Sequence, residues 1–288
     1  MGKAAYLLVS SLFLSACTDL QAVNTASTSL VAASSSWDAV ANEWFASCSR
    51  RMQIDKYPPN NCVNAKKATD GLNAANKVLN NYFTALQQAS DTKNFNLEAP
   101  IATLGASVAG IPSISSSQVK SITDFGSFIS ELATNSAREK TIDTLINDGA
   151  PKAIKVIDVF HNIVVPKLSD AYAGEIRDTN STFVRYVAAS GKDTLNTNNE
   201  YCKNGPYAKD FSSGDDFVIA LEYCRRIENI VSKQSAIDSY DKSLESAKAT
   251  LQQLLDGKFK LTDAEIIKAL LKDASTLNDD VNEIKKAF

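Results

Sequence analysis

The spacing of apolar residues in two long segments constrains the fold of this chain more than any other feature. From 64 to 89, and again from 267 to 288, apolar side chains recur at alternating intervals of three and four residues. The first series is Ala65, Ala68, Leu72, Ala75, Leu79, Tyr82 and Leu86, and the second is Ile267, Leu270, Ala274, Leu277, Val281, Ile284 and Phe288. Such spacing places one continuous apolar stripe on one helix face, which must pack against other helices as in a coiled coil.

Four further segments carry helical patterns, at 37–52, 118–147, 151–190 and 217–255. Thr262 and Glu265 form a capping-box sequence before the last helix, and Pro166 is expected to kink the helix that contains it. Alternating strand patterns are nearly absent. The sequence therefore predicts an all-α domain over residues 37–288, an elongated antiparallel bundle of about six helices with coiled-coil-like packing.

The N-terminus carries an uncharged apolar run from Ala4 to Ala16, preceded by a single lysine, Lys3. The run is shorter than the roughly 18–20 residues that a membrane-spanning helix requires, and its composition is typical of an export signal. Its last residues, Leu14-Ser15-Ala16-Cys17, resemble the lipobox of bacterial lipoproteins. This resemblance covers residues 1–17. It implies removal of residues 1–16 and acylation of Cys17, with a diacylglycerol on its sulfur; an ordinary export signal is the alternative.

The residues after Cys17 are rich in Ser, Thr and Ala and contain one charge, Asp19. This composition predicts a flexible tether over residues 17–36, between the lipid and the domain. In the lipoproteins that the N-terminus resembles, an aspartate directly after the acylated cysteine favours retention in the inner membrane. Thr18 occupies that position here. The resemblance therefore implies the outer membrane, with the domain in the periplasm or at the cell surface.

Four other cysteines, an even number in a chain expected to be exported, indicate two disulfides. Three pairings are possible. Proximity in the sequence favours Cys48 with Cys62 and Cys202 with Cys224. Because there is no Cys-x-x-Cys motif and only one histidine, no metal site is expected.

The chain shows no constellation typical of catalysis. Its only histidine, His161, falls on the apolar stripe between Ile157 and Val164, so a hydrogen-bonded structural role is favoured over a catalytic one. The formal net charge of −3 is spread along the chain, which argues against a nucleic-acid partner. We expect no catalytic residues and no cofactor.

The segment from 99 to 119 carries no charge at all, although its neighbours are charged every few residues. The favoured interpretation is a buried connector with a short helix. The alternative is an exposed docking or membrane-inserting tip that uses Ile101, Leu104, Val108, Ile111 and Ile114.

Together these patterns predict an outer-membrane lipoprotein, not an enzyme, that acts by binding a partner protein as a scaffold, adaptor or inhibitor. A membrane-active or pore-forming-like helical protein that uses the neutral segment is the alternative.

Overall fold

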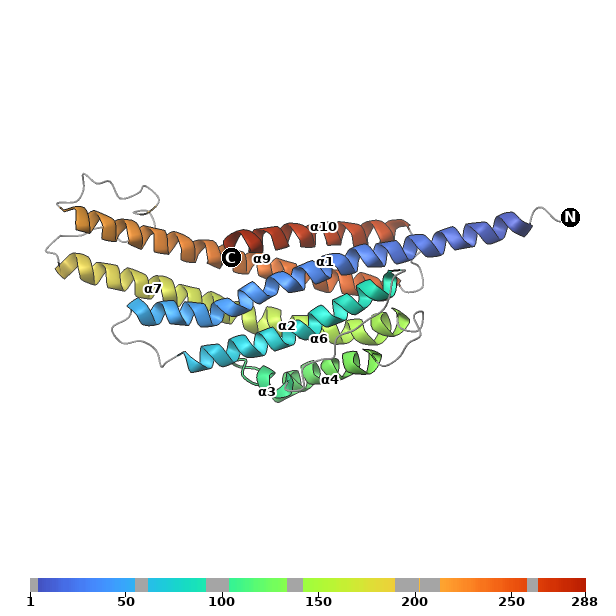
Figure 1. The fold of residues 1–288 in the computed structure, drawn as a ribbon, viewed down its shortest axis with the longest axis horizontal. Coiled ribbons are helices and arrows are strands. Elements are labelled where there is room, and N and C mark those ends of the chain that lie inside the picture. Colours follow the sequence, from blue (N-terminus) through green and yellow to red (C-terminus); the bar gives the residue numbers. More distant parts are fainter. Residues whose placement is uncertain are drawn as a thin grey trace.

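The structure is a computed structural model. It describes the backbone of residues 5–54, 62–91, 104–133, 142–189, 202, 213–257 and 264–288, and the side chains of these residues except those of 5–19, 133, 257, 264 and 266. Throughout these ranges the regular structure is helical, and the helices pack into an elongated antiparallel bundle (Figure 1).

Seven α-helices of ten or more residues lie within the described ranges, where about six were expected. They are α1 (Ala5–Ile54), α2 (Val63–Ser90), α4 (Ser116–Ala133), α6 (Ala150–Val159), α7 (Val165–Ala189), α9 (Gly214–Gly257) and α10 (Ala264–Ala287). We call the end where α1 and α7 finish and α2 and α9 begin the distal end, and the opposite end, where α9 finishes and α10 begins, the base (Figure 1).

Helix α1 lies in the middle of the bundle, where it packs against α2, α7, α9 and α10. Its core side chains follow two adjacent series with the same intervals of three and four residues. One series is Ala22, Ala26, Ser29, Ala33, Ser36 and Val40, and the other is Val23, Ser27, Leu30, Ser34, Trp37, Ala41 and Trp44. A helix with two buried series can contact neighbours on two sides, which suits a central position.

This arrangement corrects the predicted tether. Residues 20–36 belong to α1, and Ala26, Leu30 and Ala33 are fully buried, so the prediction of a flexible segment is wrong for this range. The serines fit inside because their hydroxyls donate to backbone carbonyls of the same helix, as Ser27 does to Val23 (2.8 Å) and Ser36 to Ala33 (2.7 Å). Small side chains let the neighbouring helices approach α1 closely.

The two predicted apolar stripes are buried, apart from their end positions. In α2, every predicted position from Ala68 to Leu86 lies in the core, and in α10 the same holds from Leu270 to Ile284. An aromatic cluster joins α1 to α2, η2 and α9. The ring of Trp37 lies 6.0–6.4 Å from those of Phe83, Phe160 and Tyr240, and its indole N–H donates to the Ser243 hydroxyl (2.8 Å).

Two π-helical turns lie in the continuous helical stretch that contains α6 and α7. They are η1 (Leu145–Gly149) and η2 (Phe160–Val164), and each ends two residues before a proline, Pro151 or Pro166. A proline cannot donate to the carbonyl four residues earlier, and its ring crowds that carbonyl. Widening of the preceding turn accommodates both effects. The kink expected at Pro166 thus takes the form of a π-helical turn.

Candidate functional site

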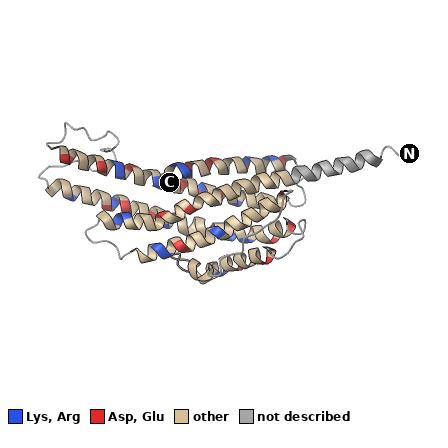
Figure 2. Cartoon of the chain, in the orientation of Figure 1, with Lys and Arg blue, Asp and Glu red and all other residues tan. Residues whose placement is uncertain are grey.

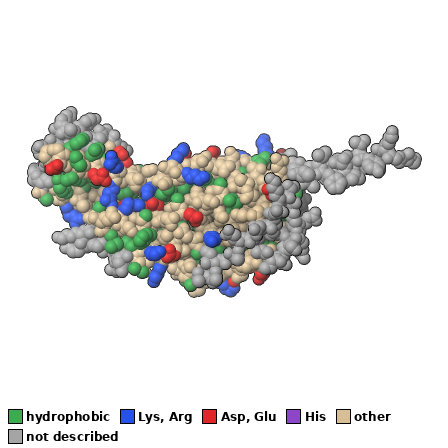
Figure 3. Space-filling view, viewed as in Figure 1, with side chains coloured by type: hydrophobic (Ala, Val, Ile, Leu, Met, Phe, Trp, Pro, Cys, Tyr) green, Lys and Arg blue, Asp and Glu red, His purple; other side chains and the backbone are tan. Residues whose placement is uncertain are grey.

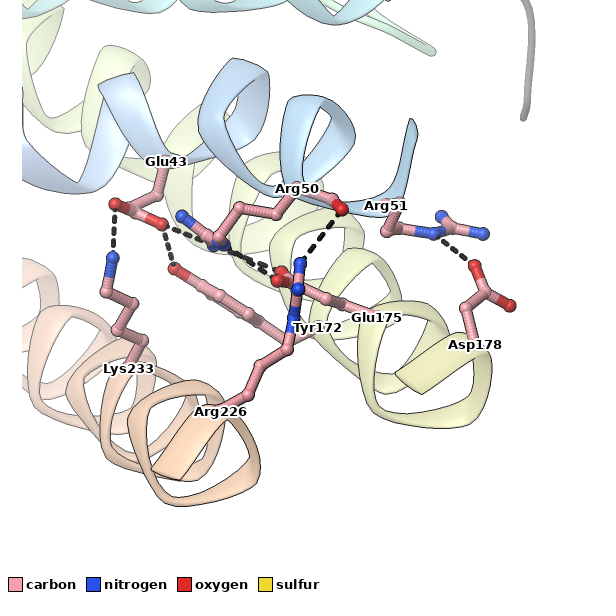
Figure 4. A network of polar contacts seen from close by, with 8 residues as sticks. All are labelled: Glu43, Arg50, Arg51, Tyr172, Glu175, Asp178, Arg226 and Lys233. Carbon is pink, nitrogen blue, oxygen red and sulfur yellow. Dashed lines mark hydrogen bonds and ion pairs between the residues drawn. The ribbon is translucent and has the colours of Figure 1, made fainter. Parts of the chain in front are cut away.

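A network of charged side chains joins α1, α7 and α9 near the distal end (Figure 4). Glu43 of α1 is at its centre. Its carboxylate accepts hydrogen bonds from Lys233 of α9 (2.7 Å), from Arg50 seven residues along α1 (2.8 Å), and from the Tyr172 hydroxyl of α7 (3.0 Å). One buried carboxylate therefore connects three helices.

Arg50 and Arg51 extend the network along α7. Arg50 donates to both carboxylate oxygens of the fully buried Glu175 (2.7 and 3.0 Å), and Arg51 donates to Asp178 (2.6 Å). Arg226 of α9 donates to the backbone carbonyl of Arg50 (2.9 Å). The bidentate contact fixes the orientation of the Arg50 guanidinium as well as its position.

Burial and pairing compete in setting the protonation of these groups. Burial by itself would raise the pKa of Glu43, but hydrogen bonds from Lys233 and Arg50 outweigh it, and the pKa lies below its ordinary value. Burial would lower the pKa of Arg50, and its bonds to Glu175 and Glu43 raise it instead. Burial and the nearby Glu43 charge raise the pKa of Tyr172. Glu43 and Arg50 are therefore charged at neutral pH, and the Tyr172 phenol is protonated.

Such an arrangement braces the three helices against one another. The charges of Glu43, Arg50, Glu175 and Lys233 are directed at one another. The sequence analysis did not identify these residues. The available signals were the seven-residue spacing of Glu43 and Arg50, which places both on one helix face, and the three-residue spacing of Glu175 and Asp178.

Beyond the network, the ends of α7 and α9 form a small second core. It contains Phe183, Val187, Tyr223 and Ile227 together with the disulfide between Cys202 and Cys224, and the rings of Phe183 and Tyr223 stack with centroids 4.0 Å apart. We call this part the tip. Its own hydrophobic contacts and its disulfide stabilise the tip as an extension of the bundle.

The second disulfide also lies at the distal end. Cys48 near the end of α1 is bonded to Cys62 at the start of α2. Both pairings are those favoured by sequence proximity. One joins the end of α1 to the residue before α2, and the other joins Cys202 to α9, both at the end of the bundle that carries the charge network.

Exposed large hydrophobic side chains gather at this end. Six of the nine found among the described residues belong to it, and Figure 3 shows hydrophobic surface there. They are Phe45 and Met52 of α1, Val63 of α2, Val184 of α7, and Val218 and Leu221 of α9. We call these six the distal surface. Charged residues of both signs lie along the helices, at the distal end as well as elsewhere (Figure 2).

A polar groove of about 440 Å³ runs between α1 and α2. It is lined by Ser35, Asp38, Asn42, Asn73, Asn76, Lys77, Asn80 and Asn81. Amide hydrogen bonds cross it, from Asn76 to the Ser34 carbonyl (2.7 Å) and from Asn73 to Asn42 (2.9 Å). These bonds hold α1 to α2 along their exposed margin.

His161 lies in η2 beside a second groove of about 390 Å³. Its Nδ1 is 2.6 Å from a carboxylate oxygen of Asp241, and 38% of its side chain is exposed. The residue is a hydrogen-bonded boundary histidine, as expected. Among the described side chains, no three His, Cys, Asp or Glu residues are grouped so that they could hold a metal ion.

The neutral segment is packed against the bundle where it is described. Leu104 and Val108 of the short helix α3 (Leu104–Val108) are buried, as is Ile111, while Ile114 is partly buried against the core. Gly71 of α2 lets the segment approach closely, because a Cβ there would lie 2.5 Å from the Ser107 carbonyl oxygen. These side chains form a connector and not an exposed tip. Ile101 lies outside the described residues.

The predicted lipid site falls on α1, but the Cys17 side chain is outside the described residues. No helix in the described part of the chain combines the length and apolar character needed to cross a membrane. No protein-family model matches the sequence, and no significant match was found among curated proteins or solved structures.

Proposed function

We propose that this chain is a lipoprotein, anchored in the outer membrane through Cys17, that binds a partner protein with its distal surface. The observation that carries the proposal is the gathering of exposed Phe45, Met52, Val63, Val184, Val218 and Leu221 at one end of the bundle. Exposed apolar side chains cost free energy in water, and their concentration at one end of a folded protein is typical of an interaction site.

The contacts that stabilise the distal end support the same proposal. Two disulfides and the Glu43 network hold the four helix ends together. A surface that is already ordered before binding loses little conformational entropy when a partner docks. An ordered binding surface of this kind suits a scaffold, adaptor or inhibitor.

The anchor is supported by the Leu14-Ser15-Ala16-Cys17 sequence. Among the described side chains of α1, the first buried one is Ala22, five positions after Cys17. Cleavage before Cys17 would thus leave the whole described core intact.

Site-specific photo-cross-linking in intact cells tests the proposal with a matched pair of positions. Leu221 of the distal surface is 43% exposed, and Leu271, in the base half of α10, is 42% exposed. A photoreactive residue at Leu221 is expected to give one discrete adduct, and the same residue at Leu271 is expected to give none. Leu221→Asp should abolish an adduct formed from Val218, whereas Leu271→Asp should leave it unchanged.

Equal adduct patterns from the two positions, or none from any position of the distal surface, would refute the assignment of this end as the binding surface. Circular dichroism of each variant establishes that the helical fold is retained.

A further inference from the structure

The position of the first buried residues in α1 limits how far the domain can be from its lipid. If Cys17 is the acylated first residue, only Thr18, Asp19, Leu20 and Gln21 separate it from the buried Ala22. A fully extended chain spans at most about 3.6 Å per residue, so Cys17 lies within about 18 Å of Ala22. Along the helix, whose bounds begin before Cys17, the separation is about 7.5 Å.

The turn of α1 around residues 22–26 is held by core packing and by hydrogen bonds to α2. Val23 and Ala26 are buried in the main core. The Asn24 amide donates to the Gln87 carbonyl (3.2 Å) and to the Ser90 hydroxyl (3.4 Å) at the end of α2. Detaching this turn to lengthen the link would expose core side chains and break these bonds. The segment between Cys17 and Ala22 therefore stays short.

From these facts we infer that the base of the bundle is held close to the lipid headgroups and that the distal end points away from them. This inference rests on the lipid anchor of the proposed function. From Ala22 to Ile54, α1 is continuous, and 32 residues at 1.5 Å each amount to about 50 Å. The distal surface, which begins at Phe45, is thus presented about 35 Å or more from the anchoring leaflet.

Depth-dependent quenching tests this geometry without any partner. The acylated protein is reconstituted into phosphatidylethanolamine and phosphatidylglycerol vesicles that carry a nitroxide quencher on a fraction of the headgroups. A fluorophore is attached at Thr25→Cys near the base or at Val184→Cys on the tip, both exposed positions. The label near the base is expected to be quenched several-fold more strongly than the label on the tip.

A twenty-residue Gly/Ser insertion between Thr18 and Asp19 is the matched control. It should keep the protein on the vesicles in a flotation assay and reduce the quenching at Thr25→Cys to the level at Val184→Cys. Equal quenching of the two labels without the insertion would overturn the inference, whether because the bundle lies flat or because its base is remote.

Flotation separates this result from a failure of the anchor. A protein that does not float with the vesicles lacks the lipid, and both the anchor and the inferred orientation then fall. If the protein floats but the two labels are quenched equally, the inferred orientation is refuted and the anchor is retained.

Discussion

Replacing Glu43 by Gln removes the charge at the centre of the network and leaves a side chain of almost the same volume. Lys233, with only 14% of its side chain exposed, then faces a neutral amide in place of a carboxylate 2.7 Å away. Arg50 keeps its contact with Glu175. The cost therefore comes mainly from leaving the lysine ammonium poorly solvated and without its counter-charge.

The expected loss of stability follows from this geometry. Breaking a buried ion pair by removing one partner costs about 3–5 kcal/mol, and Glu43 retains 11% side-chain exposure, so we expect about 2–3 kcal/mol. For a domain of this size the corresponding decrease in Tm is about 5–10 °C. Replacing both partners, as Glu43→Gln with Lys233→Met, should recover part of the loss because no unpaired charge remains.

The effect also depends on pH. The pKa of Glu43 in the folded protein lies below its ordinary value of 4.5. Its ionised form therefore stabilises the fold above pH 4.5, and this contribution is lost as the pH falls through that value toward the lower folded-state pKa. The stability difference between parent and Glu43→Gln should be full at neutral pH and should shrink in acid.

Urea unfolding at several pH values, followed by circular dichroism, measures both quantities. The control is Glu222→Gln, which removes an exposed partner of Arg225 at 3.6 Å and should change stability by less than about 0.5 kcal/mol. A Glu43→Gln protein as stable as the control variant at neutral pH would refute the reasoning that the network braces the distal end.

Other predictions concern the anchor, the connector and the disulfides. Labelling with a palmitate analogue should mark the protein, and Cys17→Ser should abolish the label and leave an uncleaved precursor; a label that survives the substitution contradicts the anchor. Val108→Lys should lower the Tm strongly because Val108 is fully buried, whereas a charge at the exposed neighbour Ala109 should not; equal Tm values would contradict the packed connector. Gly71→Ala should cost about 1–3 kcal/mol in urea unfolding, because its Cβ would meet the Ser107 carbonyl oxygen; an unchanged midpoint would contradict that close contact. Reduction of both disulfides should lower the Tm but leave the helical spectrum at room temperature, because the large core remains; loss of that spectrum is the contrary outcome.

The helices that sequence analysis predicts well are those with large apolar side chains at regular intervals. The stripes of α2 and α10 also contain alanine, but their Leu, Ile, Val and Tyr residues recur often enough to reveal both the period and the buried face. The cysteine pairing was equally accessible, because both disulfides connect residues that are close in the sequence.

The first half of α1 was misread because small residues occupy its core positions. Ser27 and Ser34 hold places in the same series as Leu30 and Trp37, and a search for large apolar residues passes over them. Serine and alanine are frequent in linkers and also at close helix contacts, and composition alone does not separate the two. Positions 23, 30, 37 and 44, occupied by Val, Leu, Trp and Trp, carried the missed heptad signal.

The charge network was inaccessible for a different reason. Glu43 and Lys233 are 190 positions apart, and Arg50 and Glu175 are 125 apart. No local pattern brings such residues together. Only the packing of α1 between α7 and α9 does so.

The central place of α1 also sets an order of events in folding. The hydrogen bond from Trp37 to Ser243 spans 206 positions, and α1 packs against α10, the last helix of the chain. Helix α1 precedes all of these partners along the chain, so it completes its contacts only when α10 is available. Until the C-terminal residues are available, part of its surface remains without native partners, and partly folded chains that expose apolar surface aggregate readily. A chain truncated before α10 would keep most of its helices and still lack the partner that closes the core.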